Sequence, residues 1–176
     1  MIILHNLREN RLIDVIDGCE ERIDLKVLYS VLNVALEIAA EGREKSRVGT
    51  AFIIGDSDEV MTRSHQLVLN PFHGHAGCSI NDQNNWETIK AFAVLDGAFI
   101  IGEDGTVLAA GRYLDIDARD IHLREGLGEW HTAAAAITRD TEAVAVTVSE
   151  SGGVVRIYRD GLEIMEIEPE LKLTRI

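Results

Sequence analysis

Apolar residues recur at spacings of three and four between residues 25 and 39, a pattern typical of an amphipathic helix. Asp24 is placed to cap the start of this helix, and Gly42 to end it. Residues 1–23 alternate only weakly, so we expect an N-terminal extension with one or two short strands, followed by the main domain at residues 24–176. The apolar stripe of the helix consists of Leu25, Leu28, Val31, Leu32, Ala35, Leu36 and Ala39.

The next segment combines a buried strand and a second helix. Residues 49–55 form an apolar run bounded by glycines, which predicts a strand. The helix is expected from Asp58 to Val68 with Ser57 as its cap. It must end before Pro71, because the residue that precedes a proline avoids the helical region.

The second half of the chain is rich in predicted strands. After a loop at residues 70–85, Asn85 is placed to cap a short helix through Val94. The run Gly102-Glu103-Asp104-Gly105 predicts a hairpin, because Asp-Gly readily adopts positive φ. The other elements expected are strands at 98–101, 107–110, 143–148, 154–158 and 162–167 and an alanine-rich helix at 131–137.

Helices and strands mix along the chain without strict alternation. This order predicts an α/β fold with connectivity of the α+β kind, in which helices flank a central, twisted, mixed β-sheet. The chain has 176 residues, which suits a single domain with a short extension.

Charge and apolar run lengths exclude two classes of function. The chain carries 17 Lys and Arg against 30 Asp and Glu, a net charge of −13, which argues against a general nucleic-acid binder. The longest apolar run, residues 27–40, is interrupted by polar residues and is too short to span a membrane. Cys19 and Cys78 are isolated, so we expect reduced thiols and a cytoplasmic location.

Two imidazoles and one thiol form the most conspicuous candidate for a metal site. His73, His75 and Cys78 together offer three positions for zinc. No fourth ligand follows at the spacing of a zinc finger, so a polar surface loop is the favoured interpretation.

Three junctions between predicted elements are candidates for a nucleotide site. Asp96-Gly97-Ala98 precedes a buried strand, where a carboxylate lies at a sheet edge and glycine admits a ligand to the backbone. Gly128-Glu129-Trp130-His131-Thr132 enters a helix, whose free amides favour phosphate. Ser149-Glu150 begins a tight turn that could serve a phosphate or a metal. Taken singly, each segment has a more common structural interpretation. The first is an ordinary turn, the second a capped helix with a surface histidine and a packed indole, and the third a hairpin turn.

In order along the chain, these segments resemble the diadenylate cyclase domain, the nucleotide-binding domain shared with the DNA integrity scanning protein DisA. The detail is most like the archaeal branch, and the resemblance runs from the first helix to about Gly161. The segments that carry it are Gly49-Thr50-Ala51-Phe52, Asn70-Pro71-Phe72, Leu95 to Ile101, Ala109 to Leu114, Gly126-Leu127-Gly128, His131 to Ala134 and Val148-Ser149-Glu150.

The resemblance implies a metal-dependent enzyme that condenses two ATP molecules into cyclic di-AMP and two pyrophosphates, with Mn²⁺ or Mg²⁺ as cofactor. It implies a homo-oligomer in which two active sites face each other, and no nucleic-acid or membrane partner. Asp96 and His131 are then the catalytic residues, and Asp96 and Glu150 the metal ligands. The expected ATP-binding residues are Gly97, Ala98, Gly128, His131, Thr132, Ser149 and Glu150.

The chain departs from the family pattern in one motif. The family has arginine before the histidine, whereas Trp130 precedes His131 here and Glu129 adds a negative charge. Two hypotheses follow. The chain is an active diadenylate cyclase, or it is a catalytically weakened module that binds ATP or cyclic di-AMP and regulates a partner.

Overall fold

A seven-stranded mixed sheet forms the centre of the protein. The computed structural model describes residues 13–42 and 48–168. The strands are β1 (Thr50–Ile54), β2 (Ser64–Gln66), β3 (Ala98–Ile101), β4 (Val107–Leu114), β5 (Val144–Val148), β6 (Val155–Arg159) and β7 (Leu162–Ile167). Their order in the sheet is β2-β4-β3-β1-β5-β6-β7. Only the β1–β3 pair among these strands is parallel, so the predicted mixed sheet is confirmed.

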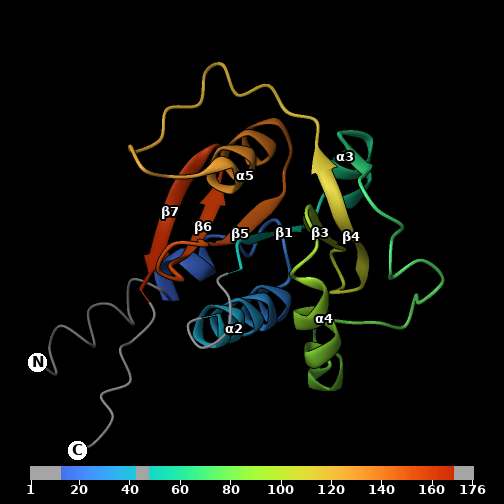
Figure 1. Cartoon of the computed structure of the whole chain (residues 1–176). Helices are drawn as coiled ribbons and strands as arrows, with labels where there is room; N and C mark the ends of the chain where they lie inside the picture. The colour runs from blue at the N-terminus through green and yellow to red at the C-terminus, as the bar shows by residue number, and fades with distance from the viewer. Residues whose placement is uncertain (1–12, 43–47, 169–176) are drawn as a thin grey trace, which may run out of the picture.

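Helices cover both faces of this sheet (Figure 1). The helices are α2 (Leu25–Glu41), α3 (Ser57–Thr62), α4 (Trp86–Phe92) and α5 (Glu129–Asp140), with a 3₁₀ turn at Gln83–Asn85 before α4. Helices α2 and α4 lie on one face and α5 on the other (Figure 1). None of the helices within residues 13–42 and 48–168 is long and apolar enough to cross a membrane.

The α2 face holds the bulkier core. Asp24 caps α2 as predicted, because its carboxylate accepts a hydrogen bond of 2.8 Å from the backbone N–H of Lys26. Phe52 of β1 and Phe99 of β3 stack beneath this helix with ring centroids 4.7 Å apart. Both rings are essentially fully buried, so they contribute much of the apolar area that stabilises this layer.

The α5 face combines a set of alanines with a few larger side chains. Ala133–Ala136 of α5 are buried. The first three of them pack in one cluster with Ala51, Ala98 and Ala145 of the strands. Small side chains at these positions leave room for the helix to lie close to the strands. The alanine-rich helix predicted at residues 131–137 is confirmed and extends by about half a turn to one turn at each end.

The structure corrects the expectation for the segment before α2. Residues 13–17 are helical rather than a strand, while residues 1–12 lie outside the described part. Ile16, Cys19 and Ile23 are buried at helical spacing against the same core as α2, which the weak alternation of the sequence did not reveal. The division of the chain at residue 24 stays a prediction.

The helix predicted from Asp58 to Val68 is wrong in its second half. Helix α3 ends at Thr62, and β2 then pairs with β4. The guanidinium of Arg112 on β4 donates to the carbonyl oxygens of Met61 and Ser64, and so satisfies backbone groups that a longer helix would have paired internally. Ser57 is the first helical residue rather than the cap, and its N–H and hydroxyl donate to the carboxylate of Glu103.

The remaining boundaries differ little from the sequence prediction. The hairpin between β3 and β4 is confirmed, with Gly105 at a φ of 89°. Asn85 precedes α4 without a capping hydrogen bond from its side chain, and the helix ends at Phe92 instead of Val94. Strand β4 continues to Leu114, because it pairs with β2 as well as with β3.

Candidate functional site

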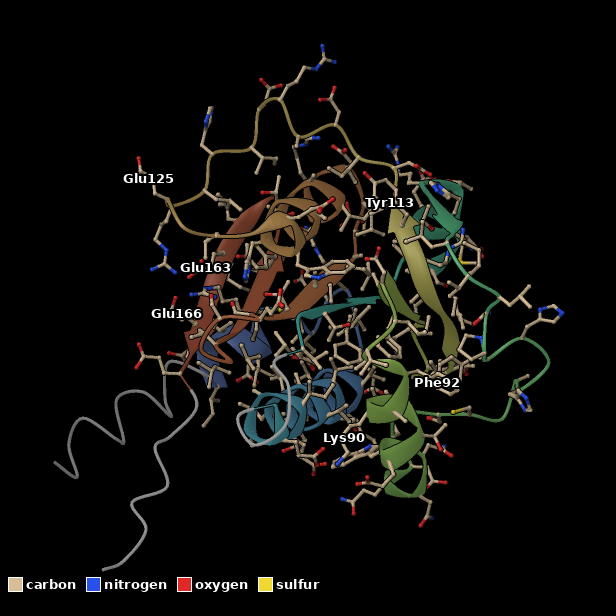
Figure 2. All side chains as sticks on the ribbon, viewed as in Figure 1. Lys90, Phe92, Tyr113, Glu125, Glu163 and Glu166 are labelled. Atoms are coloured by element: carbon tan, nitrogen blue, oxygen red, sulfur yellow. The ribbon has the colours of Figure 1, made fainter. Side chains whose placement is uncertain are left out.

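A cavity of about 300 Å³ opens between the end of β4 and the first turn of α5. Tyr113 stands at this end of β4, near the segment that leads over to α5 (Figure 2). Asp96, in the loop between α4 and β3, contributes an exposed carboxylate to the lining. The lining residues are Asp96, Tyr113, Leu114, Ile116, Ala118, Glu129, Trp130, Thr132 and Ala133.

Gly97 places Asp96 at the cavity by a close backbone approach. Its φ is 116°, a conformation that residues with a side chain rarely adopt. A Cβ at this position would lie 2.3 Å from the carbonyl carbon of Gly111 on β4. Glycine is therefore required for contact with β4, which is a different reason from the ligand approach expected from the sequence. Ala98 follows as the first, fully buried residue of β3.

The N-terminus of α5 forms one wall of the cavity. Gly128 is the N-cap residue, is exposed, and supplies no side chain to pair with the first amides. Trp130 and Thr132 of the first turn line the cavity, as does the exposed carboxylate of Glu129. This wall therefore offers unpaired N–H groups, an indole and a hydroxyl to a ligand, next to a negative charge.

His131 points away from the cavity into the protein and is only 3% exposed. Its Nδ1 lies 3.0 Å from the hydroxyl of Tyr158 and 3.2 Å from that of Thr147, and its Nε2 lies 2.9 Å from Ser149 Oγ. The surface histidine considered from the sequence is therefore wrong. Burial, and then the positive charge of Arg156, lower the pKa of His131 to about 4, so the ring is neutral near pH 7.

Sequence reasoning missed Arg156, the charged partner of this buried group. Arg156 lies in β6 and donates from a terminal guanidinium nitrogen to Ser149 Oγ at 2.7 Å. The signal was present in the sequence, because a single arginine stands between Val155 and Ile157 in an apolar strand. A charge at such a position is seldom buried unless it has partners inside the fold.

Ser149 and Glu150 are neighbours in the chain but lie in different environments. Ser149 is 8% exposed and belongs to the buried group around His131, whereas Glu150 is exposed. A Cβ built on Gly49 would lie 3.2 Å from Glu150 Cβ and 3.3 Å from Trp130 Cδ1, so Glu150 lies close to the indole of Trp130 but is not among the residues that line the cavity. The turn that follows joins β5 to β6, as the hairpin interpretation predicted.

The structure thus divides the predicted site residues into two groups. Asp96 and Thr132 share the cavity, whereas His131 and Ser149 are joined behind the first turn of α5. Within residues 13–42 and 48–168, the one cluster of three potential metal ligands is Glu37, Glu41 and Glu87, so His73, His75 and Cys78 do not form such a cluster.

Comparison with known proteins decides the family. Residues 37–162 match the family model described as DAC, DisA bacterial checkpoint controller nucleotide-binding. The chain belongs to this family. The resemblance drawn from Asp96-Gly97-Ala98, His131 and Ser149-Glu150 is therefore confirmed at the level of the family.

Two curated relatives of the DAC family come from archaea. A diadenylate cyclase of Methanocaldococcus jannaschii is 47% identical over 84% of this chain and 47% of its own length. A diadenylate cyclase of Haloferax volcanii is 41% identical over 85% of this chain and 55% of its own length. The chain thus spans about half the length of these curated relatives, and the archaeal likeness expected from the sequence is confirmed.

Solved structures support the fold. A hypothetical membrane-spanning protein from Bacillus cereus aligns with a TM-score of 0.58 at 15% identity, over 77% of this chain and 61% of its own. DacA from Staphylococcus aureus, solved as a double mutant, aligns with a TM-score of 0.50 at 23% identity, over 78% of this chain and 84% of its own. Both likenesses concern the fold alone.

The charges that line the cavity of this DAC domain oppose the binding of an anionic ligand. Two carboxylates, Asp96 and Glu129, belong to the nine described lining residues, and none of the nine is Lys or Arg. A phosphate group placed here meets net negative charge, relieved by the amides at the start of α5. The lining side chains themselves therefore bring no positive charge to a phosphate group.

Proposed function

We propose that this DAC domain condenses two molecules of ATP into cyclic di-AMP with release of two pyrophosphates. The observation that carries the proposal is the Asp96 carboxylate at a cavity bounded by the first turn of α5, in a chain of this family. The names of the relatives from M. jannaschii and H. volcanii support the same activity.

In this reaction, the protein mainly positions the two nucleotides and stabilises their charge. In each transfer, the ribose 3′-oxygen of one ATP forms a bond to the α-phosphorus of the other, and the bond to pyrophosphate breaks. The 3′-hydroxyl proton leaves to the carboxylate of Asp96, which acts as general base. Amides of the first turn of α5, from Gly128 onward, orient the phosphates. Because each site holds one ATP, two copies must face each other.

A divalent cation, Mn²⁺ or Mg²⁺, suits the donors present. Asp96 and Glu150 are carboxylates, and such ions are commonly held by one or two carboxylates together with substrate phosphates. The acidic cavity lining, which lacks a basic side chain, fits the same requirement. When bound, the cation neutralises phosphate charge and makes the 3′-hydroxyl more acidic.

The other predicted residues take supporting roles in this proposal. The Thr132 hydroxyl binds the nucleotide from the cavity wall. Gly97 and Ala98 are buried outside the lining residues, and they act by placing Asp96 at the cavity. His131 and Ser149 are hydrogen-bonded to each other behind the first turn of α5, and in this proposal they hold that turn in place for the phosphates. Cys19 and Cys78 are both free thiols, which supports a cytoplasmic location.

A second function is favoured by one specific observation. Trp130 lines the cavity where the family pattern has arginine, so a planar set of five donors is replaced by an indole with one. This replacement favours a weakened module that binds ATP or cyclic di-AMP and regulates a partner.

The experiment that tests the proposal is incubation of the purified protein with ATP and Mn²⁺, followed by mass spectrometry for cyclic di-AMP. Parent protein should form the product, and specific activity should rise with protein concentration until paired copies saturate. Asp96→Asn keeps the shape and removes the charge, so we expect product formation to fall by about a hundredfold or more. Full activity of Asp96→Asn, or a constant specific rate down to monomeric concentrations, contradicts this mechanism.

Thermal melting with ATP and Mn²⁺ separates the two functions. A ligand that binds only the native state stabilises it by about 2.7 kcal/mol at a hundredfold excess over Kd. Stabilisation without product would favour the regulatory module. A melting curve that millimolar ATP and Mn²⁺ leave unchanged would count against both.

A further inference from the structure

Arg156 is a buried cation that the proposed chemistry does not use. Its side chain is 9% exposed, and its guanidinium contacts groups on two sides. On one side it donates to Ser149 Oγ at 2.7 Å. On the other it pairs with Glu166 at 3.0 Å and with Glu163 at 3.6 Å.

The two glutamates connect Arg156 to the segment between β4 and α5. Glu163 and Glu166 lie along β7 (Figure 2), where they pair with Tyr158 and Arg156 of β6. Arg124 of the connecting segment pairs with both carboxylates. A continuous series of polar contacts therefore runs from this segment through β7 and Arg156 to Ser149 and His131.

The direction of the hydrogen bonds in this series follows from the chemistry of arginine. A guanidinium has five N–H donors and no acceptor, so Ser149 Oγ must accept from Arg156. An oxygen that already accepts from a cation becomes a poorer second acceptor, and its own hydroxyl becomes a stronger donor. The nearest ring nitrogen, His131 Nε2 at 2.9 Å, accepts the hydrogen bond that this hydroxyl donates.

We propose that Arg156 is a positioning residue that directs the Ser149 hydroxyl to His131 Nε2 and thereby holds His131 in the tautomer protonated at Nδ1. The Nδ1–H then donates to the hydroxyl of Tyr158 or Thr147, 3.0 and 3.2 Å away. Because His131 lies between Trp130 and Thr132, which line the cavity, a fixed ring fixes this turn of α5. The consequence for turnover rests on the proposed cyclase function, whereas the tautomer does not.

Three variants test the proposal in the full chain. Arg156→Met removes the donors and keeps much of the apolar stem, whereas Ser149→Ala deletes the hydroxyl with little change of volume. Arg159→Met is the matched control, because Arg159 ends the same strand but contacts Gly18 and Asp160 instead. The ring nitrogen shifts of His131 in long-range ¹⁵N–¹H NMR spectra report the tautomer near pH 7, and kinetics report kcat and KM separately.

We expect the parent and Arg159→Met to show a protonated Nδ1 and an unprotonated Nε2. Arg156→Met and Ser149→Ala should show a mixture of both tautomers, and kcat should fall by about tenfold or more while KM changes little, because the turn of α5 is less well positioned. If Arg156→Met does not fold, Ser149→Ala carries the same test.

Two results overturn the proposal. One is a parent protein in which Nε2 carries the proton, or a tautomer that stays the same in Arg156→Met and Ser149→Ala. The other is a rise in KM with unchanged kcat for Arg156→Met, because that result makes Arg156 a substrate contact. If the parent forms no cyclic di-AMP, the cyclase function fails, and the tautomer alone still decides this inference.

Discussion

The two faces of the sheet use the same strands for different purposes. Toward α2, β1 and β3 present Phe52, Ile54, Phe99 and Ile101, all buried in an apolar core. Toward α5, the alternating positions of the same two strands carry alanine and isoleucine, and the polar group around His131 lies on this face. The α2 face buries large apolar side chains, whereas the α5 face leaves room for polar groups with fixed partners.

This difference teaches how stability and chemistry are separated within one small domain. Side chains alternate across a strand, so neighbours such as Ala98 and Phe99 belong to opposite layers. A substitution on the α2 face should therefore change the free energy of unfolding without changing the cavity. One on the α5 face should change chemistry more than stability, unless it breaks the buried polar group.

Phe99→Ala should give the largest effect and tests the α2 side of this comparison. Removing a stacked, buried ring destabilises a protein by about 3–5 kcal/mol, through lost transfer free energy and the cavity left behind. Urea denaturation measures the loss, and Phe99→Leu should lose less because it fills more of the space. Binding of ATP to the folded fraction should not change, and weakened binding would show that the two faces are coupled.

Acid should weaken the α5 face through His131. The pKa of this ring falls from 6.5 to about 4 on folding, first because it is buried and second because Arg156 is positive. The unfolded chain then binds more protons, so this stabilisation is fully present above pH 6.5 and is lost as the pH falls toward 4. At about 1.4 kcal/mol for each pKa unit, the loss is about 3.5 kcal/mol.

The measurement is the free energy of unfolding at several pH values for the parent and His131→Gln, which cannot titrate. The difference between the two should shrink between pH 6.5 and pH 4. Parallel curves would show that His131 titrates alike in the folded and unfolded states.

Trp130→Arg should raise turnover, and it tests whether the α5 face determines the rate of the reaction. A guanidinium at the first turn of α5 adds a donor and a positive charge to a cavity lined by Asp96 and Glu129. One such contact in the transition state is typically worth about 2.7–4 kcal/mol, or about a hundredfold to a thousandfold in rate. Cyclic di-AMP formation by the folded variant measures it, and turnover at or below that of the parent rejects Trp130 as the limiting residue.

The sequence predicted the parts of the fold that depend on local pattern. The apolar spacing from Leu25 to Ala39 was sufficient to find α2, and Asp24 to find its start. Asp96 was recognised at a junction between helix and strand, which is where the structure places it. Local pattern failed at α3, because Arg112 of a distant strand determines where that helix ends.

The candidate site was less predictable, because its parts come together only through the sheet. Nothing in the sequence pairs Arg156 with Ser149, or Tyr113 with Trp130 across a cavity. The resemblance to a family named His131 and Ser149 but could not tell that they lie behind the cavity, joined to each other. Their burial depends on the alanines that bring α5 close to the strands.

Lys90→Met should give the smallest effect and tests whether charges outside the core matter on the α2 face. The Lys90 ammonium contacts Glu37 and Glu41 of α2 at 2.9 and 2.6 Å and Glu87 of its own helix at 2.7 Å, and these hydrogen bonds raise its pKa against the opposing effect of burial. The Lys90 side chain is only 7% exposed, but its partners reach solvent: Glu37 is 43% exposed and Glu41 and Glu87 more so. Each pair is therefore worth about 0.2–1 kcal/mol.

We therefore expect Lys90→Met to lower the free energy of unfolding by about 1 kcal/mol, partly because its carboxylates then repel one another. Salt screens exposed charges, so the loss should shrink when thermal unfolding is repeated at 1 M NaCl, where the Debye length is about 3 Å. Glu87→Gln, which removes the most exposed partner, should cost less than Lys90→Met. A loss that salt does not change, or a fall in cyclic di-AMP formation, would contradict the separation of the two faces, because Lys90 lies on the side of the sheet opposite the cavity.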